Sequence, residues 1–530
     1  METPYGINLA VYLISTYFGD LVAKVCECLL RNGSLSFANI LRSTELNRVQ
    51  VKNSLLVLIQ HNCVQAYVIQ QEGGFGEAPK ILTQYLALFD NIIHHLRFSK
   101  FLAIVSDDLG KECSDILEGL LQHGRLSEDQ ILDRYMDISN QNEAQDAIKE
   151  NFRRLVGARY VERCPKPEPF LAPPSEEEVA AKKRRLGAKA SKVQVLFQEP
   201  ETIEQRVLAA AAPMDSIRFL LESFINDDNC MVDGERNEDN WMDGDKGRQN
   251  DQDLDMTTQA QKEKKVLWRV NFEEFVRRLR HKACVANVKG RLDEGTATVL
   301  SSILKATRSA ETKVKMESSV PLSMDSILEE VIKTDKGRSM NVDRVRAALI
   351  QLGCQLPVIE LDETFSIDLG AIIELAQLEE VESIVLKRYG REAYRMFRLL
   401  SKAGRPMETE KIADTTFVDK AETAKILLTL WKDDYLQMET LTANSGKETK
   451  YMVWKVNKDL LWIHVLDEMY HAALNLRLRL MREMEQEKEI ILAPKGIQFE
   501  KRVDRLKKVR NVLESSLMKL VDATMLFRDF

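Results

Sequence analysis

The sequence predicts a mainly α-helical protein with small β-hairpins, divided into several domains and ending in a helical hairpin. Three observations predict it: a glycine-containing turn recurs after apolar helices, apolar residues recur at spacings of three and four, and short alternating stretches follow the repeated helices. At 530 residues the chain is too long for one hydrophobic core and should form roughly three to five domains.

The repeated turn reads LLRNGSLSFANIL at 29–41, LLQHGRLSEDQIL at 120–132 and LLSKAGRPMETEKI at 399–412. Each copy predicts the end of a helix, a turn whose glycine adopts a left-handed conformation, and a short helix with a capped start. The predicted turn glycines are Gly33, Gly124 and Gly404. The predicted caps are Ser36, Ser127 and Thr409.

A longer helix follows each of the three turns. A further copy of this helix begins near Val345, and the residues before it match the repeat less clearly. These helices begin near Val51, Ile148, Val345 and Ala424, and each is followed by a β-prone stretch, near Val64, Val161, Val358 and Leu436. The helical spacing predicts core positions at Val51, Leu55, Ile148, Phe152, Leu349, Leu428 and Trp431. The clearest hairpin alternates from Leu436, turns at 443–446 and continues to Lys455.

Helix, turn, helix, longer helix and hairpin is the order of a winged helix. The predicted fold is therefore mainly α with small β wings: four tandem winged-helix domains followed by a C-terminal antiparallel coiled-coil hairpin. The predicted domains are 1–90, 91–164, 201–370 and 371–457, with the hairpin at 458–530. Prolines and charges at 165–200 predict a linker, and 11 acidic against 3 basic residues at 227–261 predict a disordered insertion within the third domain.

The C-terminal hairpin carries apolar residues at coiled-coil spacing on both sides of Pro494. Folding back there would bring the acidic end of the first helix, 483–489, beside the basic start of the second, 501–508. Two helices alone bury too little surface, so an outer stripe should dock on another surface. The candidate partner-docking residues are Leu466, Met469, Leu476, Leu480, Leu513 and Leu517.

Composition narrows the class of function. The net charge is -7, so any nucleic-acid contact should be local. The eight cysteines show no metal-ligand spacing and are expected to be buried thiols. No catalytic constellation, cofactor motif or apolar run long enough to span a membrane is present in the sequence. We expect no enzyme activity, no cofactor, no metal and no membrane association.

A basic run in the linker gives a choice between an exposed, solvated segment and a nuclear-import signal. It consists of Lys182, Lys183, Arg184 and Arg185.

The opening residues resemble a known family. Tyr17-Phe18-Gly19, the turn ending at Gly33 and the helix from Val51 to Asn62 are similar to the winged-helix subunit of RNA polymerase III, which is itself similar to the large subunit of general transcription factor IIE. The order of parts also matches. The resemblance implies a non-catalytic nuclear subunit that forms a heterotrimer with two smaller polymerase-specific subunits on the polymerase clamp. It also implies contact with the general initiation factor, and support of promoter opening and initiation at genes for small structured RNAs.

A winged helix contacts nucleic acid mainly through its third helix and wing. The second domain has the densest bases there, so we expect it to contact the promoter backbone without sequence specificity, as single-stranded or duplex DNA. The candidate contacts are Lys149, Arg153, Arg154, Arg159, Arg163, Arg48 and Lys52.

Two other classes of protein remain open. A scaffold of the proteasome-lid type would have helix pairs and a single wing near its C-terminus, and the repeated turns from residue 29 onward argue against it. A free DNA-binding regulator should be more basic and should bind a defined site alone.

Overall fold

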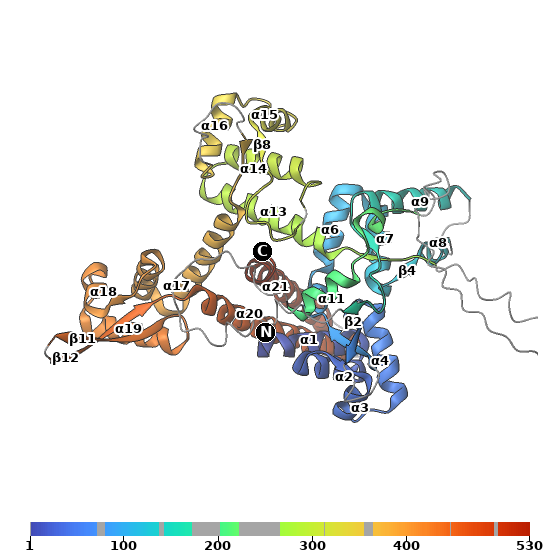
Figure 1. Ribbon diagram of the computed structural model, residues 1–530, viewed down its shortest axis with the longest axis horizontal. Coiled ribbons are helices and arrows are strands. Elements are labelled where there is room, and N and C mark those ends of the chain that lie inside the picture. Colours follow the sequence, from blue (N-terminus) through green and yellow to red (C-terminus); the bar gives the residue numbers. More distant parts are fainter. Residues whose placement is uncertain are drawn as a thin grey trace, which may run out of the picture. The chain divides into compact units, whose positions relative to one another are not determined.

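The computed structural model describes residues 2–71, 80–136, 142–171, 202–221, 265–311, 313–354, 364–445, 447–491 and 497–530 (Figure 1). The described chain is mostly helical with small sheets, as predicted. It divides into two compact units. One comprises residues 1–31, 92–97 and 272–530, and the other comprises 32–91 and 98–271. Each unit is treated separately below.

The 32–91 and 98–271 unit begins with a set of elements in the predicted order. β1 (Leu35–Ser36) is followed by α3 (Phe37–Thr44), α4 (Arg48–Gln60), β2 (Val64–Gln71) and β3 (Lys80–Ala87). The strands form an antiparallel sheet in the order β1-β3-β2, with Val64 opposite Ala87. Ser36 caps α3 by accepting a hydrogen bond from the Asn39 amide, as predicted. Residues 72–79, between β2 and β3, lie outside the described residues.

A second set follows in the same unit and corrects a predicted boundary. α7 (Lys111–His123), β4 (Leu126–Ser127), α8 (Glu128–Met136), α9 (Asn142–Gly157) and β5 (Val161–Arg163) come in order. The sheet is completed by β7 (Leu267–Val270), which lies between β4 and β5. Residues 265–271 therefore belong with the second set, although the sequence placed them in the third domain. A strand supplied from about 100 residues downstream leaves no local spacing signal.

The residues around 202–221 also pack in this unit, contrary to the predicted boundary at residue 200. The backbone amide of Lys166 donates to the Ala211 carbonyl in α11 (Ile203–Ala211). Arg218, in α12 (Asp215–Arg218), donates to the buried carboxylate of Glu162 at 2.5 Å. β6 (Phe170–Leu171) pairs with β2 in parallel, so part of the predicted linker extends the first sheet.

The first and second sets of this unit are joined by a polar contact at the end of α4. The Gln60 side chain donates to the carbonyls of His123 and Arg125 at 2.9 and 2.5 Å, and the Arg125 amide donates to the Gln60 carbonyl at 3.0 Å. Arg125 Nε donates to Asn62 Oδ1 at 2.9 Å, and burial lowers the pKa of the Arg125 guanidinium. Gly124 has φ +78, and a Cβ there would lie 2.1 Å from the Gln60 carbonyl oxygen. The second set's turn therefore fits against the first set only with glycine at this position.

The other unit contains the third set, whose core is apolar. α14 (Glu294–Thr307), β8 (Leu322–Ser323), α15 (Met324–Ile332), α16 (Val342–Gln351) and β9 (Thr364–Phe365) come in order, and β8 pairs with β9. Leu300, Ile327 and Leu349 are completely buried in a single cluster. α13 (Phe272–Arg291) precedes the set and packs on α14. The predicted β-prone stretch near Val358 lies outside the described residues up to the start of β9.

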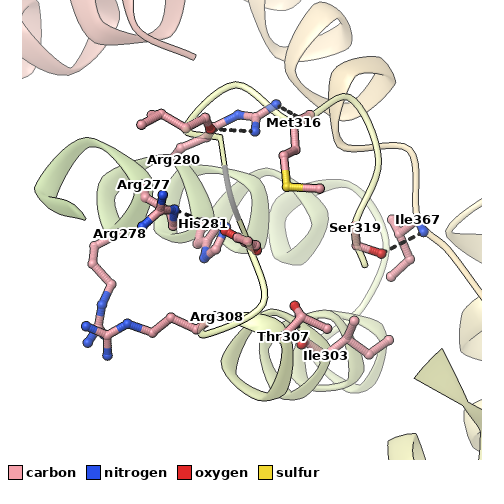
Figure 2. A network of polar contacts seen from close by, with 12 residues as sticks. Arg277, Arg278, Arg280, His281, Ile303, Thr307, Arg308, Met316, Ser319 and Ile367 are labelled. Carbon is pink, nitrogen blue, oxygen red and sulfur yellow. Dashed lines mark hydrogen bonds and ion pairs between the residues drawn. The ribbon is translucent and has the colours of Figure 1, made fainter. Parts of the chain in front are cut away.

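A buried polar network fixes α13 to the segment that follows α14 (Figure 2). The Glu274 carboxylate, 1% exposed, pairs with Arg277, with Arg278 at 3.3 Å and with Arg308 at 2.7 Å. Glu311 pairs with Arg277 at 3.3 Å and contacts His281 Nε2 at 3.2 Å. Arg280 donates to the carbonyls of Val314 and Met316 at 3.1 and 2.6 Å. These contacts hold residues 308–311 and 313–316, where few apolar side chains are available for packing.

The fourth set begins in the second half of α17 (Leu369–Ala403), which breaks at Gly390, where φ is +88. β10 (Met407–Glu408), α18 (Thr409–Thr416), α19 (Lys420–Lys432), β11 (Gln437–Ser445) and β12 (Lys447–Lys455) follow, with sheet order β10-β12-β11. The predicted hairpin is confirmed, but pairing continues to Ser445 opposite Lys447, so the turn is tighter than predicted.

The turns of the repeat adopt the predicted positive φ, with values of 76° at Gly33, 78° at Gly124 and 59° at Gly404. Ser127 is confirmed as a cap, because its hydroxyl accepts from the Gln130 amide. The predicted cap Thr409 is wrong. It is the first residue of α18, and its hydroxyl accepts from Trp454 Nε1 at 2.8 Å instead.

α20 (Lys458–Ile491) and α21 (Ile497–Arg528) pack against each other. The ring of Trp462, near the start of α20, meets the ring of Phe527, near the end of α21, at 5.4 Å, so the helices are antiparallel. The N-terminal helix α1 (Pro4–Phe18) packs on α20 as well. Tyr5 stacks on His471 with centroids 4.1 Å apart, and its amide donates to Asp467.

The end of α21 is held by a buried ion pair in the same unit. Arg97, in η1 (His94–Arg97), lies 2.6 Å from Asp529. Arg97 also contacts His94 Nδ1 at 3.0 Å, and burial lowers the pKa of His94 well below its ordinary value, with the Arg97 charge adding to the effect. The folded protein therefore favours the neutral form of His94.

Six of the seven described cysteines are buried and all seven are free thiols, as predicted. Burial raises the pKa of Cys26 to about 12. Within the part of the chain that the structure describes, no helix has both the length and the apolar character needed to cross a bilayer.

Candidate nucleic-acid interface

α9 is the third helix of the second set and carries the densest predicted contacts. Its inner face buries Phe152, Leu155 and Val156, which places Arg153 and Arg154 on the exposed side and Lys149 at its edge. The Arg153 side chain is 48% exposed, and its ion pair with Glu150 is long, at 3.7 Å. An exposed pair of this length contributes little to stability, so Arg153 is available to an external anion.

Arg154 has an internal role in addition to its exposure. Its guanidinium donates to Asn151 Oδ1 at 3.2 Å and to the Leu109 carbonyl at 3.0 Å, at the end of α6 (Phe98–Leu109). Asn151 in turn donates to Glu112 at 2.9 Å. Arg154 therefore connects α9 to α6. Replacing Arg154 would destabilise this contact in addition to weakening the binding of any anion.

Arg159 and Arg163 lie beyond α9 and face the 215–221 segment. The Arg159 guanidinium lies 5.7 Å from the centroid of the Phe219 ring. Arg163 donates through Nε and Nη2 to the Leu220 carbonyl, at 2.9 and 2.5 Å, and lies over Trp268. Their donors are engaged by the protein's own backbone and rings, which the sequence could not indicate because residue 220 is far away in the chain.

The first set presents two bases on the outer side of α4. Both Arg48 and Lys52 are exposed, and Arg48 lies over the Phe37 ring at 5.9 Å. A capping box starts the helix, since Asn47 accepts from the Gln50 amide and Gln50 accepts from the Asn47 amide. The other end of α4 is occupied by the Gln60 contact with the second set, whereas Arg48 and Lys52 lie in its first two turns.

Two predicted core residues of the fourth set are wrong. Leu428 is 43% exposed and Trp431 is 40% exposed. The buried face of α19 is formed by Thr423, Leu427 and Leu430 instead. Leu428 and Trp431 each follow a buried position by one residue, a rotation of about 100° around the helix. The other predicted core positions with described side chains are buried, except Ile148, which is half-buried.

The predicted partner-docking residues are mostly inside the chain. Leu466, Met469, Leu480, Leu513 and Leu517 are buried, and only Leu476 is partly exposed. They are buried where α20 packs against α21 and the neighbouring elements. The prediction that these residues form an outward-facing docking stripe is therefore wrong, because most of them belong to the internal core. α1 covers part of α20, and the two helices are more than 450 residues apart in the sequence. The spacing of residues within the hairpin cannot reveal such a contact. The apolar side chains that do face outward on α20 include Leu478, Met481 and Met484.

The import candidates Lys182, Lys183, Arg184 and Arg185, and the acidic insertion 227–261, lie outside the described residues.

Helix–turn–helix sets that are each closed by a small sheet define a protein of the multi-domain winged-helix class. Comparison with known proteins agrees. The model for the RNA polymerase III subunit RPC82 helix-turn-helix domain matches residues 8–68, that for RNA polymerase III subunit RPC82 matches 150–352, and that for the POLR3C C-terminal winged-helix domain matches 381–454.

Curated relatives carry the same description. The DNA-directed RNA polymerase III subunit RPC3 of Danio rerio is 22% identical over 508 residues, covering 92% of this chain and 86% of that protein. The human protein of that name is 20% identical with the same coverage. The Dictyostelium discoideum protein is 28% identical over 201 residues, which cover 34% of this chain and 30% of that protein. This chain belongs to the RPC3/RPC82 family of RNA polymerase III subunits.

Proposed function

We propose that the protein is a non-catalytic subunit of RNA polymerase III that assembles with two smaller polymerase-specific subunits into a heterotrimer on the clamp side. In this proposal it supports promoter opening and initiation at genes for small structured RNAs, together with the general initiation factor, in the nucleus. The observation that carries the proposal is that three models of one polymerase subunit match this chain in order.

The architecture we propose is four tandem winged-helix domains and a C-terminal antiparallel coiled coil. Its support is the recurrence of helix, short strand, two helices and closing strand in four sets, and the antiparallel packing of α20 with α21. Such an arrangement suits an assembly subunit, because each set offers a separate surface to a partner.

The assembly is tested by purifying the tagged protein from nuclei at moderate salt and identifying the associated proteins by quantitative mass spectrometry. We expect the two largest polymerase III subunits and two smaller specific subunits at near-equal amounts. Raising the salt should release the tagged protein with the two smaller subunits as a unit. Recovery of proteasome-lid subunits, or of the tagged chain alone, would contradict the proposal.

Within this function we propose that α9 contacts the promoter backbone through Lys149 and Arg153. Its support is the exposure of Arg153 and the position of half-buried Lys149 at the edge of the same side of the third helix. The Glu150 pair of Arg153 is weak, and Arg154, Arg159 and Arg163 are engaged in internal contacts. Basic side chains that contact DNA phosphates position a protein on the duplex without recognising its base sequence.

The double substitution Lys149→Ala and Arg153→Ala should reduce open-complex formation on a promoter by about threefold to tenfold, because two phosphate contacts are lost. Permanganate reactivity of thymines in the melted region measures this effect. The matched control is Lys420→Ala with Lys425→Ala on α19, whose ammonium groups pair with Glu410 and Glu422 at 3.2 and 3.4 Å. Equal loss in both variants, or loss of the subunit from the polymerase, would refute the assignment to α9.

A further inference from the structure

The outward face of α21 carries a row of bases. Lys501, Arg505, Lys508 and Lys519 are all exposed. At 100° per residue these four positions lie within about 60° of one another on the helix surface. The opposite side buries Leu506, Leu513, Leu517 and Val521, so the row points away from the helical pairing. At about 1.5 Å per residue, the row extends over about 27 Å.

Among the described residues, none of these four bases makes an ion pair. The sequence predicted that the bases of 501–508 lie beside the acidic end of α20, 483–489. Glu483 and Glu485 are the two acids of that stretch whose side chains are described, and neither makes an ion pair with Lys501, Arg505 or Lys508. On α21 itself, Glu514 pairs with Arg510 at 2.9 Å, on a different face. Asp504 and Asp522 border the row, about 60° around the helix from Lys501 and Lys519. The result is a concentrated positive stripe on a chain whose net charge is -7.

The composition of the stripe favours one class of partner. A protein interface is expected to centre on aromatic or large apolar anchors. Within the part of α21 whose side chains are described, the only exposed apolar side chain between the four bases is that of Val512. It carries no Asn or Gln that would read base edges. Each strand of duplex DNA presents one phosphate per about 3.4 Å of axis, so about 27 Å of rigid helix spans roughly eight phosphates of one strand.

We propose that the outward face of α21, formed by Lys501, Arg505, Lys508 and Lys519, is a non-specific binding surface for the phosphate backbone of double-stranded nucleic acid. This surface is proposed in addition to the one on α9, and it belongs to the other unit of the chain. A row of fixed lysine and arginine charges binds by releasing counterions from the duplex, so the binding is strong at low salt and falls steeply as salt rises.

The test uses the full-length protein and a fluorescently labelled 40-base-pair duplex of random sequence, with anisotropy measured between 50 and 200 mM KCl. The triple variant Lys501→Ala, Arg505→Ala, Lys508→Ala removes three charges from the face. We expect about a tenfold or greater loss of affinity at the lower salt, and a slope of log K against log salt that is shallower by up to about 2.7.

The matched control is Arg502→Ala, Lys507→Ala, Arg510→Ala, which removes the same charge from the same turns of α21 but off the face. It should leave the slope within about 0.5 of the parent protein. Far-ultraviolet circular dichroism checks that both variants keep their helix content. The α9 double variant, measured in parallel, should retain the contribution of α21, so failure of one surface is distinguishable from failure of the other.

Three outcomes would overturn the proposal. Equal losses in the face and control variants would show that only bulk charge matters. An unchanged slope in the face variant would show that these bases do not touch phosphate. Poly-glutamate binding that depends on the face, with no duplex binding that does, would assign the stripe to an acidic protein segment instead.

Discussion

Gly124→Ala should destabilise the 32–91 and 98–271 unit by about 3 kcal/mol or more. The new Cβ would lie 2.1 Å from the Gln60 carbonyl oxygen, so the backbone at the end of α4 would have to move. That movement disrupts the hydrogen bonds that Gln60 makes with His123 and Arg125. The left-handed backbone at φ +78 adds strain of its own.

The matched control for this substitution is Gly33→Ala. Gly33 has nearly the same φ, +76, in the same repeated turn, but a Cβ there meets nothing within 4 Å. It should cost only the backbone strain, about 1 kcal/mol. Denaturant-dependent hydrogen exchange of peptides from α4 and α7 measures the two effects locally, which suits a chain of several domains that does not unfold in one step. Similar destabilisation by both substitutions would show that the close contact with Gln60 is not decisive.

Glu274→Gln should destabilise the region of α13 and α14 by about 3 kcal/mol. Glutamine keeps the shape of the side chain but removes the charge that three guanidinium groups share, those of Arg277, Arg278 and Arg308. Arg277 is itself nearly buried, so a positive charge would be left with only Glu311 to compensate it. Figure 2 shows that this network reaches the segment following α14, so residues 308–311 and 313–316 should lose order first.

Hydrogen exchange of peptides from 272–316 and thermal unfolding measure the effect of Glu274→Gln. Glu273→Gln is the control, because it changes the same charge on the exposed side of the same helical turn and should cost less than about 0.5 kcal/mol. Protection of 308–316 that is unchanged by Glu274→Gln would mean that apolar packing alone orders this segment.

Local signals in the sequence predicted the repeated modules well. Gly33, Gly124 and Gly404 were identified because a left-handed turn excludes most side chains, and this constraint acts within a few residues. The hairpin of β11 and β12 was predicted from alternation for the same reason, since a two-residue period is visible in any short window.

The candidate sites were predicted less completely. Exposure of Arg153 followed from helical spacing, whereas the engagement of Arg163 with the Leu220 carbonyl depends on residues more than 50 positions away. Thr409 has a residue type typical of a helix cap, but it is the first residue of α18 and its hydroxyl accepts a hydrogen bond from Trp454. Trp454 lies 45 residues further along the chain, so this contact leaves no local signal in the sequence.

The sequence by itself determined the helical repeat, its turns and its membership of a helical, winged class, because periodicity and backbone conformation are properties of neighbouring residues. Only the tertiary structure decided that β7 completes the second sheet, that α1 covers α20, and that Leu428 and Trp431 face outward while Leu513 and Leu517 face inward. Amphipathic spacing shows that a helix has an apolar side. Which surface covers that side depends on contacts between distant segments, and local spacing carries no record of those contacts.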